Sequence, residues 1–253
     1  MNLSNKNVFI TGATSGIGLV STKAVANAGA NILFSGRNHD VGEHICDELS
    51  KKHPEQKFVF FCADLLKQYE IDVLWQGAIN HFGQIHCAFN NAGIEGETAK
   101  FGDSNFENWT KVLDTNLNAV WRLMKKQVNH MLQHGYGNIV NMSSTSGLIG
   151  NGFGMSAYAA SKHAIIGLSK SVALEYAKEN IRVNILCPGF IETPMVRGLC
   201  EQNPKLKKRF LQCHPIGRFG KPEEIANALV YLLSDDSAFM TGHNMILDGG
   251  LTI

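Results

Sequence analysis

Tyr158 and Lys162 are two residues whose types and spacing could do chemistry. They lie in a stretch, Ser156 to Leu168, that we interpret as a helix, and residues four apart on a helix share one face. A free phenol has a pKa of about 10, and an ammonium group held beside it favours phenolate and lowers that pKa. Such a phenol can pass a proton to or from a reacting oxygen. An isolated pair of this kind more often lies on a solvated surface, so the surrounding elements decide its meaning.

The composition excludes several functional classes. Hydrophobic residues make up 44% of the 253 residues, which is enough for a sizeable core, and the net charge of +1 gives no reason to expect nucleic acid or a membrane surface as partner. Six scattered cysteines without a C-x-x-C motif predict reduced thiols in a cytoplasmic protein, with no disulfide framework and no metal site. Because the N-terminus is polar and no long apolar run occurs, we expect no signal peptide and no membrane-spanning segment.

Strand-like and helix-like segments alternate along the whole chain. This alternation predicts an α/β fold of the doubly wound, Rossmann type, with a seven-stranded parallel sheet, helices on both faces and right-handed crossovers. We expect one domain over residues 1–253, with a loop-rich substrate insertion at about 190–221. The predicted strands are 8–10, 31–35, 58–61, 87–89, 138–142, 182–186 and 245–247. The first predicted helix opens at the glycine-rich turn 12–18 and runs to about 28–29. The other predicted helices cover about 41–52, 69–82, 106–133, 156–178 and 222–233.

Polar or glycine-rich clusters follow the predicted strands at their carboxyl ends. Ligands of open α/β sheets bind beyond those ends, so six clusters at one sheet edge predict a ligand site there. The first 35 residues, read as strand, glycine-rich turn, helix and strand, form the βαβ unit of dinucleotide folds. The clusters are Gly12–Gly18, Gly36–Asn38, Asp64, Asn90–Gly93, Ser143–Ser146 and Pro188–Thr193.

Several motifs in this order resemble those of the short-chain dehydrogenase/reductase family over essentially the whole chain. The resemblance implies an NAD(P)-dependent oxidoreductase that transfers a hydride between the cofactor and a carbonyl or secondary alcohol. It also implies a homotetramer or homodimer whose interface would involve the helices around Asn116 and Tyr158. The motifs are Thr11-Gly12-xxx-Gly16-Ile17-Gly18, Asn90-Asn91-Ala92-Gly93, Asn116, Ser144, Tyr158-xxx-Lys162, and Pro188-Gly189 followed by Thr193.

The glycine-rich turn is the expected pyrophosphate site. A pyrophosphate needs backbone N–H donors and the positive end of a helix, and glycines allow the backbone to approach it closely. The residues that we expect to supply this are Gly12, Ser15, Gly16, Ile17 and Gly18.

Further cofactor contacts are implied by the resemblance. Asp64 would contact the adenine amino group, although a helix cap is the alternative for this residue. Asn91 would lie against the adenosine and also fix the central strand. The backbone near Ile191, together with Thr193, would hold the nicotinamide carboxamide.

The end of the second strand indicates which dinucleotide is used. An acidic residue there would bind both ribose hydroxyls and repel a 2′-phosphate, but this chain has Ser35 and Gly36 followed by Arg37. A guanidinium can pair with a phosphate through charge-assisted hydrogen bonds. We therefore expect NADP(H) in preference to NAD(H), which stays possible because the glycine-rich turn contains no second basic residue.

The resemblance assigns catalytic roles to four residues. Tyr158 would be the acid/base, and Lys162 would lower its pKa and bind the nicotinamide ribose. Ser144 would hold the substrate oxygen, although Ser143 or Ser146 could take that place. Asn116 is a poor helix former, and the resemblance makes it a helix-kinking residue that holds a water against Lys162 for proton relay.

The substrate side of the site is less clearly marked. Its walls should come from 150–155 and from the insertion, and their mostly apolar side chains favour an uncharged, largely apolar alcohol or ketone. These side chains are Phe153, Met155, Phe190, Met195, Val196 and Leu199.

Two alternatives remain open. A 3-oxoacyl-[acyl-carrier-protein] reductase would need basic residues near the pocket mouth, for which Lys125 and Lys126 are candidates, whereas Glu179 stands where such reductases often carry a basic residue. A non-catalytic NADP(H)-binding sensor is the alternative from another class. It would not need Asn116, Ser144, Tyr158 and Lys162 together.

Overall fold

The sheet is the central layer of the protein. The computed structural model describes residues 1–150, 152–202 and 204–253. All the strand pairings are parallel and follow the order β3-β2-β1-β4-β5-β6-β7, which confirms the predicted seven-stranded sheet. The strands are β1 (Asn7–Ile10), β2 (Asn31–Gly36), β3 (Phe58–Cys62), β4 (Cys87–Asn90), β5 (Gly137–Met142), β6 (Ile181–Pro188) and β7 (Asn244–Leu247).

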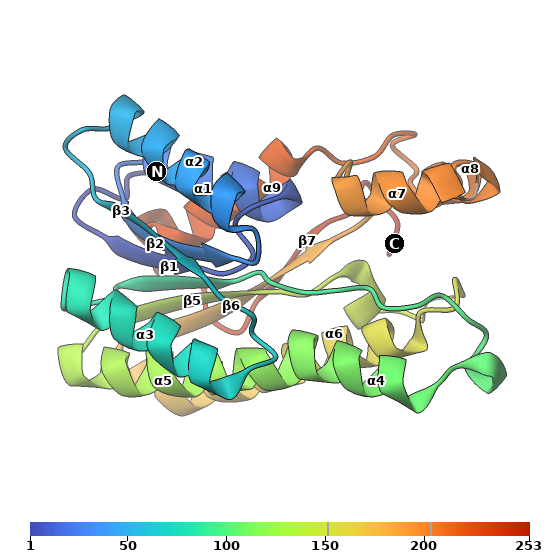
Figure 1. The fold of residues 1–253 in the computed structure, drawn as a ribbon. Helices are drawn as coiled ribbons and strands as arrows, with labels where there is room; N and C mark the ends of the chain where they lie inside the picture. The colour runs from blue at the N-terminus through green and yellow to red at the C-terminus, as the bar shows by residue number, and fades with distance from the viewer. Residues whose placement is uncertain (151, 203) are drawn as a thin grey trace.

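Helices cover both faces of this sheet, as the alternation predicted (Figure 1). One face carries α1 (Gly16–Asn27), α2 (His39–Lys52) and α9 (Pro222–Leu233). The other face carries α3 (Gln68–Phe82), α4 (Phe106–Leu113), α5 (Ala119–His134) and α6 (Ser156–Tyr176). In the described part of the chain, no helix is long and apolar enough to cross a membrane.

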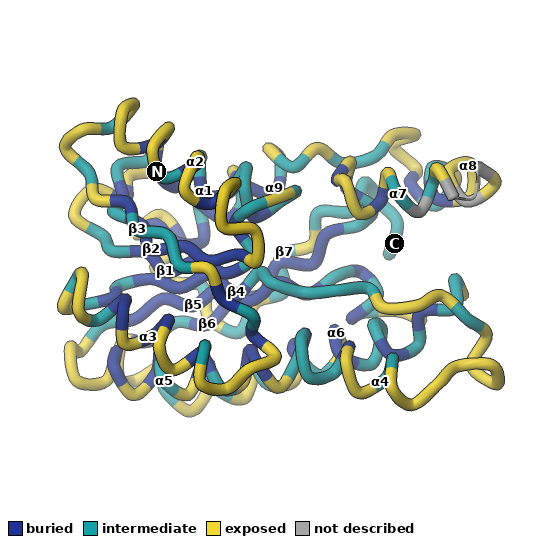
Figure 2. Tube along the Cα trace, viewed as in Figure 1, coloured by how far each residue is buried: buried dark blue, intermediate teal, exposed yellow. Residues whose placement is uncertain are grey.

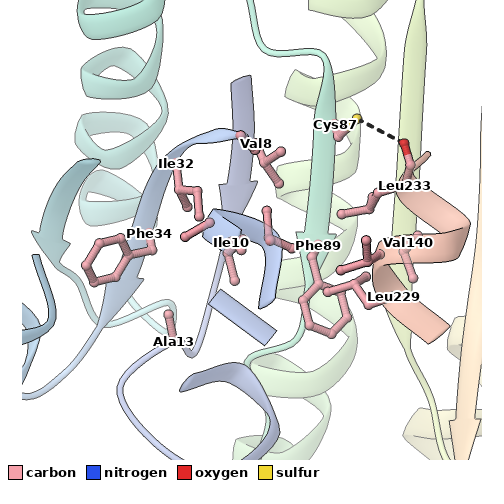
Figure 3. Packing of buried hydrophobic residues seen from close by; sticks show 14 of the residues in the cluster. Val8, Ile10, Ala13, Ile32, Phe34, Cys87, Phe89, Val140, Leu229 and Leu233 are labelled. Carbon is pink, nitrogen blue, oxygen red and sulfur yellow. Dashed lines mark hydrogen bonds between the residues drawn. The ribbon is translucent and has the colours of Figure 1, made fainter. Parts of the chain in front are cut away.

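The core lies on both sides of the strands. Figure 2 shows the strands as the most buried part of the chain, whereas exposure is concentrated on the outer helix surfaces. Side chains of β1, β2, β4 and β5 form one buried cluster with residues of α1, α2 and α9, and Figure 3 shows Phe89 of β4 beside Leu229 of α9. The Cys87 thiol donates a weak hydrogen bond to the Leu233 carbonyl at 3.8 Å. This packing holds the strand ends, and hence the loops after them, in fixed positions.

The structure corrects three details of the sequence prediction. The predicted helix 106–133 is interrupted by a π-helical turn at Asp114–Asn118. Strand β6 continues through Pro188, which is tolerated as the last residue of the strand.

The third correction concerns the insertion predicted as loop-rich. It contains two helices, α7 (Pro194–Gln202) and α8 (Pro204–Gln212), which lie beyond the sheet edge in Figure 1. Each begins with proline, which suits a first helical turn because its missing N–H would be unbonded there anyway. This signal was present in the sequence, and the prediction overlooked it.

Candidate active site

The glycine-rich turn after β1 is shaped for close approach by a ligand. Gly12 has a φ of +68°, and a Cβ added to it would lie 2.8 Å from the Ala92 Cα. Gly18 leaves no room for a Cβ either, because that atom would collide with the Gly12 carbonyl oxygen. The Ser15 side chain makes no capping hydrogen bond to the first turn of α1. The N–H groups of this turn can therefore bind an anion, so the residues fit a dinucleotide pyrophosphate.

Asn91 holds this turn against the end of β4. Its Nδ2 donates to the carbonyl oxygens of Thr11 and Gly12, at 3.1 Å each. In return, Thr11 Oγ1 accepts hydrogen bonds from the backbone N–H groups of Asn91 and Ala92. Both amide protons of Asn91 are therefore committed to the backbone, and only its Oδ1 remains for the adenosine contact that the sequence suggested.

Asp64 and Arg37 lie after β3 and β2, at the same sheet edge. Asp64 Oδ1 accepts a hydrogen bond from Leu66 N at 3.1 Å, so this carboxylate helps to form the turn before α3. Arg37 is exposed, and its guanidinium makes no ion pair with any described residue. It is therefore accessible to a phosphate group.

Thr193 comes close to the glycine-rich turn from the other half of the sheet. A Cβ added to Gly16 would lie 3.5 Å from the Thr193 methyl group, and Thr193 is buried. Its Oγ1 accepts a hydrogen bond from Val196 N at 3.3 Å, which begins α7. Ile191 forms an isolated parallel bridge with Gly220. Thr193 therefore connects the turn with α7, which together with α8 forms a helical cover beyond the sheet edge.

Lys162 is buried on α6 and points to the end of β5. Its Nζ donates to the Met142 carbonyl oxygen at 2.9 Å and lies 5.4 Å from the centroid of the Tyr158 ring. Burial lowers the pKa of this ammonium to about 8. Only 3% of the residue is exposed, so among the described residues one hydrogen bond, to the Met142 carbonyl oxygen, holds this charge in an almost dry environment.

The Tyr158 phenol differs from the sequence expectation. Burial raises its pKa to about 12; a hydrogen bond with the Ser144 hydroxyl acts in the opposite direction, and the Glu95 charge raises the pKa further. Lys162 does not lower this pKa as we expected, because its ammonium lies over the ring and is bonded to a carbonyl. At neutral pH the phenol therefore keeps its proton, which is the form that can donate to a carbonyl oxygen.

Ser144 is better placed than Ser143 to share an oxygen with Tyr158. Ser143 Oγ is already used, because it donates to the Lys162 carbonyl oxygen at 2.9 Å. Ser144 Oγ accepts from Ser146 N at 3.2 Å and lies close enough to the phenol to lower the pKa of Tyr158. The geometry therefore favours the second serine of the pair as the partner of Tyr158.

Asn116 lies in the π-helical turn, which is the local distortion that the sequence suggested at this residue. Its side-chain amide makes two hydrogen bonds with the backbone of Ile94: Oδ1 accepts from Ile94 N and Nδ2 donates to Ile94 O, both at 2.8 Å. The same Nδ2 donates to Ser161 Oγ at 3.1 Å. Asn116 therefore fixes the loop after β4 against α6, and its part in a proton relay stays a prediction.

Glu95 is a residue of this site that sequence reasoning missed. It directly follows Ile94, is half-buried, and has a pKa raised by burial to about 7. A signal was available, because Glu95 follows the Asn90–Gly93 cluster at the same edge as the other site residues. The prediction examined the polar residues at the strand end itself and did not continue two residues further.

Aromatic side chains form much of the predicted substrate side. Phe190 stacks on Phe210 of α8 with ring centroids 4.0 Å apart, and Phe153 meets both rings edge-on. Met155 and Val196 are buried, whereas Met195 is exposed. Two parts of the expected wall, Asn151 and the Leu199 side chain, lie outside the described residues.

The basic candidates for a carrier-protein surface are on α5. Lys126 Nζ forms an ion pair with Asp72 of α3 at 2.7 Å, and Lys125 Nζ lies 5.5 Å from the centroid of the Trp121 ring. Both lysines are thus engaged by neighbours on α3 and α5.

Comparison with known proteins finds relatives over nearly the whole chain. Residues 12–252 match the family model described as Enoyl-(Acyl carrier protein) reductase. The chain is 39% identical to a cyclohexanol dehydrogenase of Acinetobacter sp. (strain SE19), covering 98% of this chain and 96% of that protein. It is 38% identical to the 3-oxoacyl-[acyl-carrier-protein] reductase FabG of Thermotoga maritima, over the full length of both.

A solved structure shows the same fold in detail. The NAD⁺-bound xylitol dehydrogenase superposes with a TM-score of 0.93 at 30% identity, covering 99% of this chain and 100% of that one. The chain belongs to the short-chain dehydrogenase/reductase family, as its motifs suggested. It is an oxidoreductase of this family that uses a nicotinamide dinucleotide and acts on alcohol or carbonyl groups.

Proposed function

We propose that this protein interconverts an uncharged, largely apolar secondary alcohol and its ketone with NADP(H). The observation that carries the proposal is the Tyr158 phenol with the Ser144 hydroxyl beside it, next to buried Lys162, at a sheet edge closed by apolar side chains. This pair can hold one oxygen and exchange one proton with it. The cyclohexanol dehydrogenase relative acts, by its name, on an alcohol of this kind.

The residues divide the reaction between them. The bound dinucleotide supplies or accepts the hydride. Ser144 donates a hydrogen bond to the substrate oxygen, and Tyr158 donates its proton to that oxygen during reduction and takes it back during oxidation. Lys162 contributes positive charge beside the phenol, and Asn116 keeps the loop after β4 in place through Ile94.

Several residues would bind the dinucleotide. The pyrophosphate would lie on Gly12, Ser15, Gly16, Ile17 and Gly18 at the start of α1. Asp64 and Asn91 would face the adenosine, and Ile191 and Thr193 the nicotinamide.

Arg37 supports NADP(H) over NAD(H). It is exposed directly after β2, where it can pair with a 2′-phosphate, and neither Ser35 nor Gly36 would repel that group. The NAD⁺-bound relative shows that this fold also accepts the other dinucleotide, so the preference depends on this side chain.

A second candidate is a 3-oxoacyl-[acyl-carrier-protein] reductase. The 38% identity to the Thermotoga maritima enzyme favours it, whereas the engagement of Lys125 and Lys126 by neighbouring side chains counts against an acidic carrier at that surface. A non-catalytic NADP(H) sensor is the candidate from another class, and it would bind the dinucleotide without turnover. For the protein in its cell we propose a cytoplasmic homotetramer or homodimer.

A panel of ketones and alcohols tests these candidates. Cyclohexanone with NADPH should be reduced, with NADH less efficient, and Arg37→Asp should reverse that preference by about 10- to 100-fold. Faster turnover of an acyl-carrier thioester than of any ketone would favour the second candidate. Dinucleotide binding without turnover of any member would contradict the proposed reaction.

A further inference from the structure

Glu95 is a carboxyl group without a partner at the site. Its side chain makes no hydrogen bond or ion pair with any described residue. It lines a hollow together with Glu97 and with Gly154, Met155 and Ala157, which lead into α6 just before Tyr158. Burial without a partner is unfavourable for a carboxylate, so this position calls for an explanation.

The segment around Glu95 is firmly anchored. Asn116 holds Ile94 on one side. On the other side Glu97 N donates to Asn108 Oδ1, and Glu97 Oε2 accepts from Asn105 Nδ2, at 2.8 Å each. Glu97 thus serves the loop itself, whereas the carboxyl group of Glu95 is held in place by its neighbours and left unused.

A structural role as a helix cap does not account for Glu95. Helix α6 begins at Ser156 without any side-chain capping hydrogen bond, so the carboxylate does not bind its first turn. The negative charge is nevertheless close enough to Tyr158 to raise the pKa of that phenol. The geometry agrees, because a Cβ added to Gly93, two residues before Glu95, would lie 3.6 Å from Lys162 Nζ. The carboxyl group therefore belongs to the surroundings of the reacting centre.

We propose that Glu95 determines substrate specificity: its carboxylate accepts a hydrogen bond from a second hydroxyl group of the substrate and repels substrates that carry a carboxylate. The favoured class is then neutral diols and hydroxyketones with an otherwise apolar body. A buried acceptor rewards a ligand that supplies the missing donor, and like charges facing each other at close range oppose binding. This inference rests on the proposed function, because it names the substrate class of the same site.

Three alcohols with one ring test it: cyclohexanol, cyclohexane-1,2-diol and 2-hydroxycyclohexanecarboxylate. For Glu95→Leu we expect the ratio of kcat/KM for the diol to that for cyclohexanol to fall about 10-fold, because the acceptor is gone. For Glu95→Gln, which keeps the size but loses the charge, we expect kcat/KM for the carboxylate to rise about 10-fold relative to cyclohexanol. Glu97→Gln, two residues further along, is the matched control and should change neither ratio.

The outcomes separate the two proposals. If wild type oxidises cyclohexanol but both Glu95 variants change kcat/KM equally for all three alcohols, the specificity role is wrong and the reaction class stands. If wild type binds the dinucleotide and oxidises none of them, the proposed function fails, and the inference fails with it. Altered ratios in Glu97→Gln of the same size would assign the effect to the loop rather than to the Glu95 carboxylate.

Discussion

The two sides of the active site are built in different ways. On the chemical side, Asn116, Ser143 and Lys162 are each bonded to backbone groups that belong to the loop after β4, to α6 or to β5. On the proposed substrate side, aromatic rings pack against one another, and the Glu95 carboxyl group has no partner among the described residues. Directional hydrogen bonds to a fixed sheet fix positions closely, whereas packing contacts can readjust. The difference suggests that the first side sets the reaction and the second sets its substrate.

Replacing Tyr158 should have the largest effect. Tyr158→Phe removes the only proposed proton donor, so we expect kcat to fall by at least about 10³-fold. The dissociation constant of the dinucleotide should change little, because the ring remains. Stopped-flow kinetics and a fluorescence titration measure the two quantities.

Tyr176→Phe, near the end of the same helix, is the control for this change. It should keep wild-type kcat, because Tyr176 packs in the core cluster on the far side of the sheet from α9. Appreciable turnover by Tyr158→Phe would remove this residue from the acid/base role and end the distinction between the two sides.

Loosening the cover should act on binding instead. Phe210 is 1% exposed and stacks on Phe190, and loss of a buried phenylalanine side chain costs about 3–5 kcal/mol of packing. We expect Phe210→Ala to raise KM for the ketone about 10-fold or more while kcat stays within about 3-fold of wild type. Steady-state kinetics over a range of ketone concentrations separates the two parameters.

The exposed Phe239 provides the matched control, since Phe239→Ala removes the same atoms from a site without packing. A Phe210→Ala variant with unchanged KM and a kcat reduced as far as in Tyr158→Phe would show that the cover takes part in the chemistry.

The smallest expected effect is a pH-dependent gain in stability. The pKa of Glu95 is raised from 4.5 to about 7 on folding, so between these values the folded protein holds a proton that the unfolded chain has released. Stability from this group is therefore lost as the pH rises through that window. At pH 8 the free energy of unfolding of Glu95→Gln should be about 1–3 kcal/mol higher than that of wild type, and the difference should vanish below about pH 4.5. Urea denaturation at both pH values measures it, and a difference independent of pH would contradict the assignment.

The fold and the chemical side could be predicted from the sequence because their signals are local. Short apolar runs ending in glycine or serine clusters mark the strands, and the parallel sheet brings those ends to one edge. The family resemblance then pointed to Tyr158, Lys162 and Ser144. The pKa of Tyr158 could not be predicted, because it depends on how deeply the phenol is buried and on the direction of the Lys162 ammonium. Neither quantity is encoded in a spacing of four residues.

The substrate side could not be predicted for a related reason. The contact between Phe190 and Phe210 joins residues that are distant in sequence and depends on how α8 packs over the site. Glu95 could be recognised as a site residue only because its carboxyl group lacks a partner among the described residues, and this requires the positions of all its neighbours. Even the helices of the insertion were signalled only by Pro194 and Pro204.

The most direct test of the central claim is a double-mutant cycle between Ser144 and Tyr158. If the two hydroxyl groups act as one unit on one substrate oxygen, their effects are strongly non-additive. The rate of NADPH oxidation in a single turnover with cyclohexanone would be measured for wild type, Ser144→Ala, Tyr158→Phe and the double variant. The account predicts that the double variant is no slower than Tyr158→Phe alone. Losses that multiply in the double variant would show that the two residues act independently, and would contradict it.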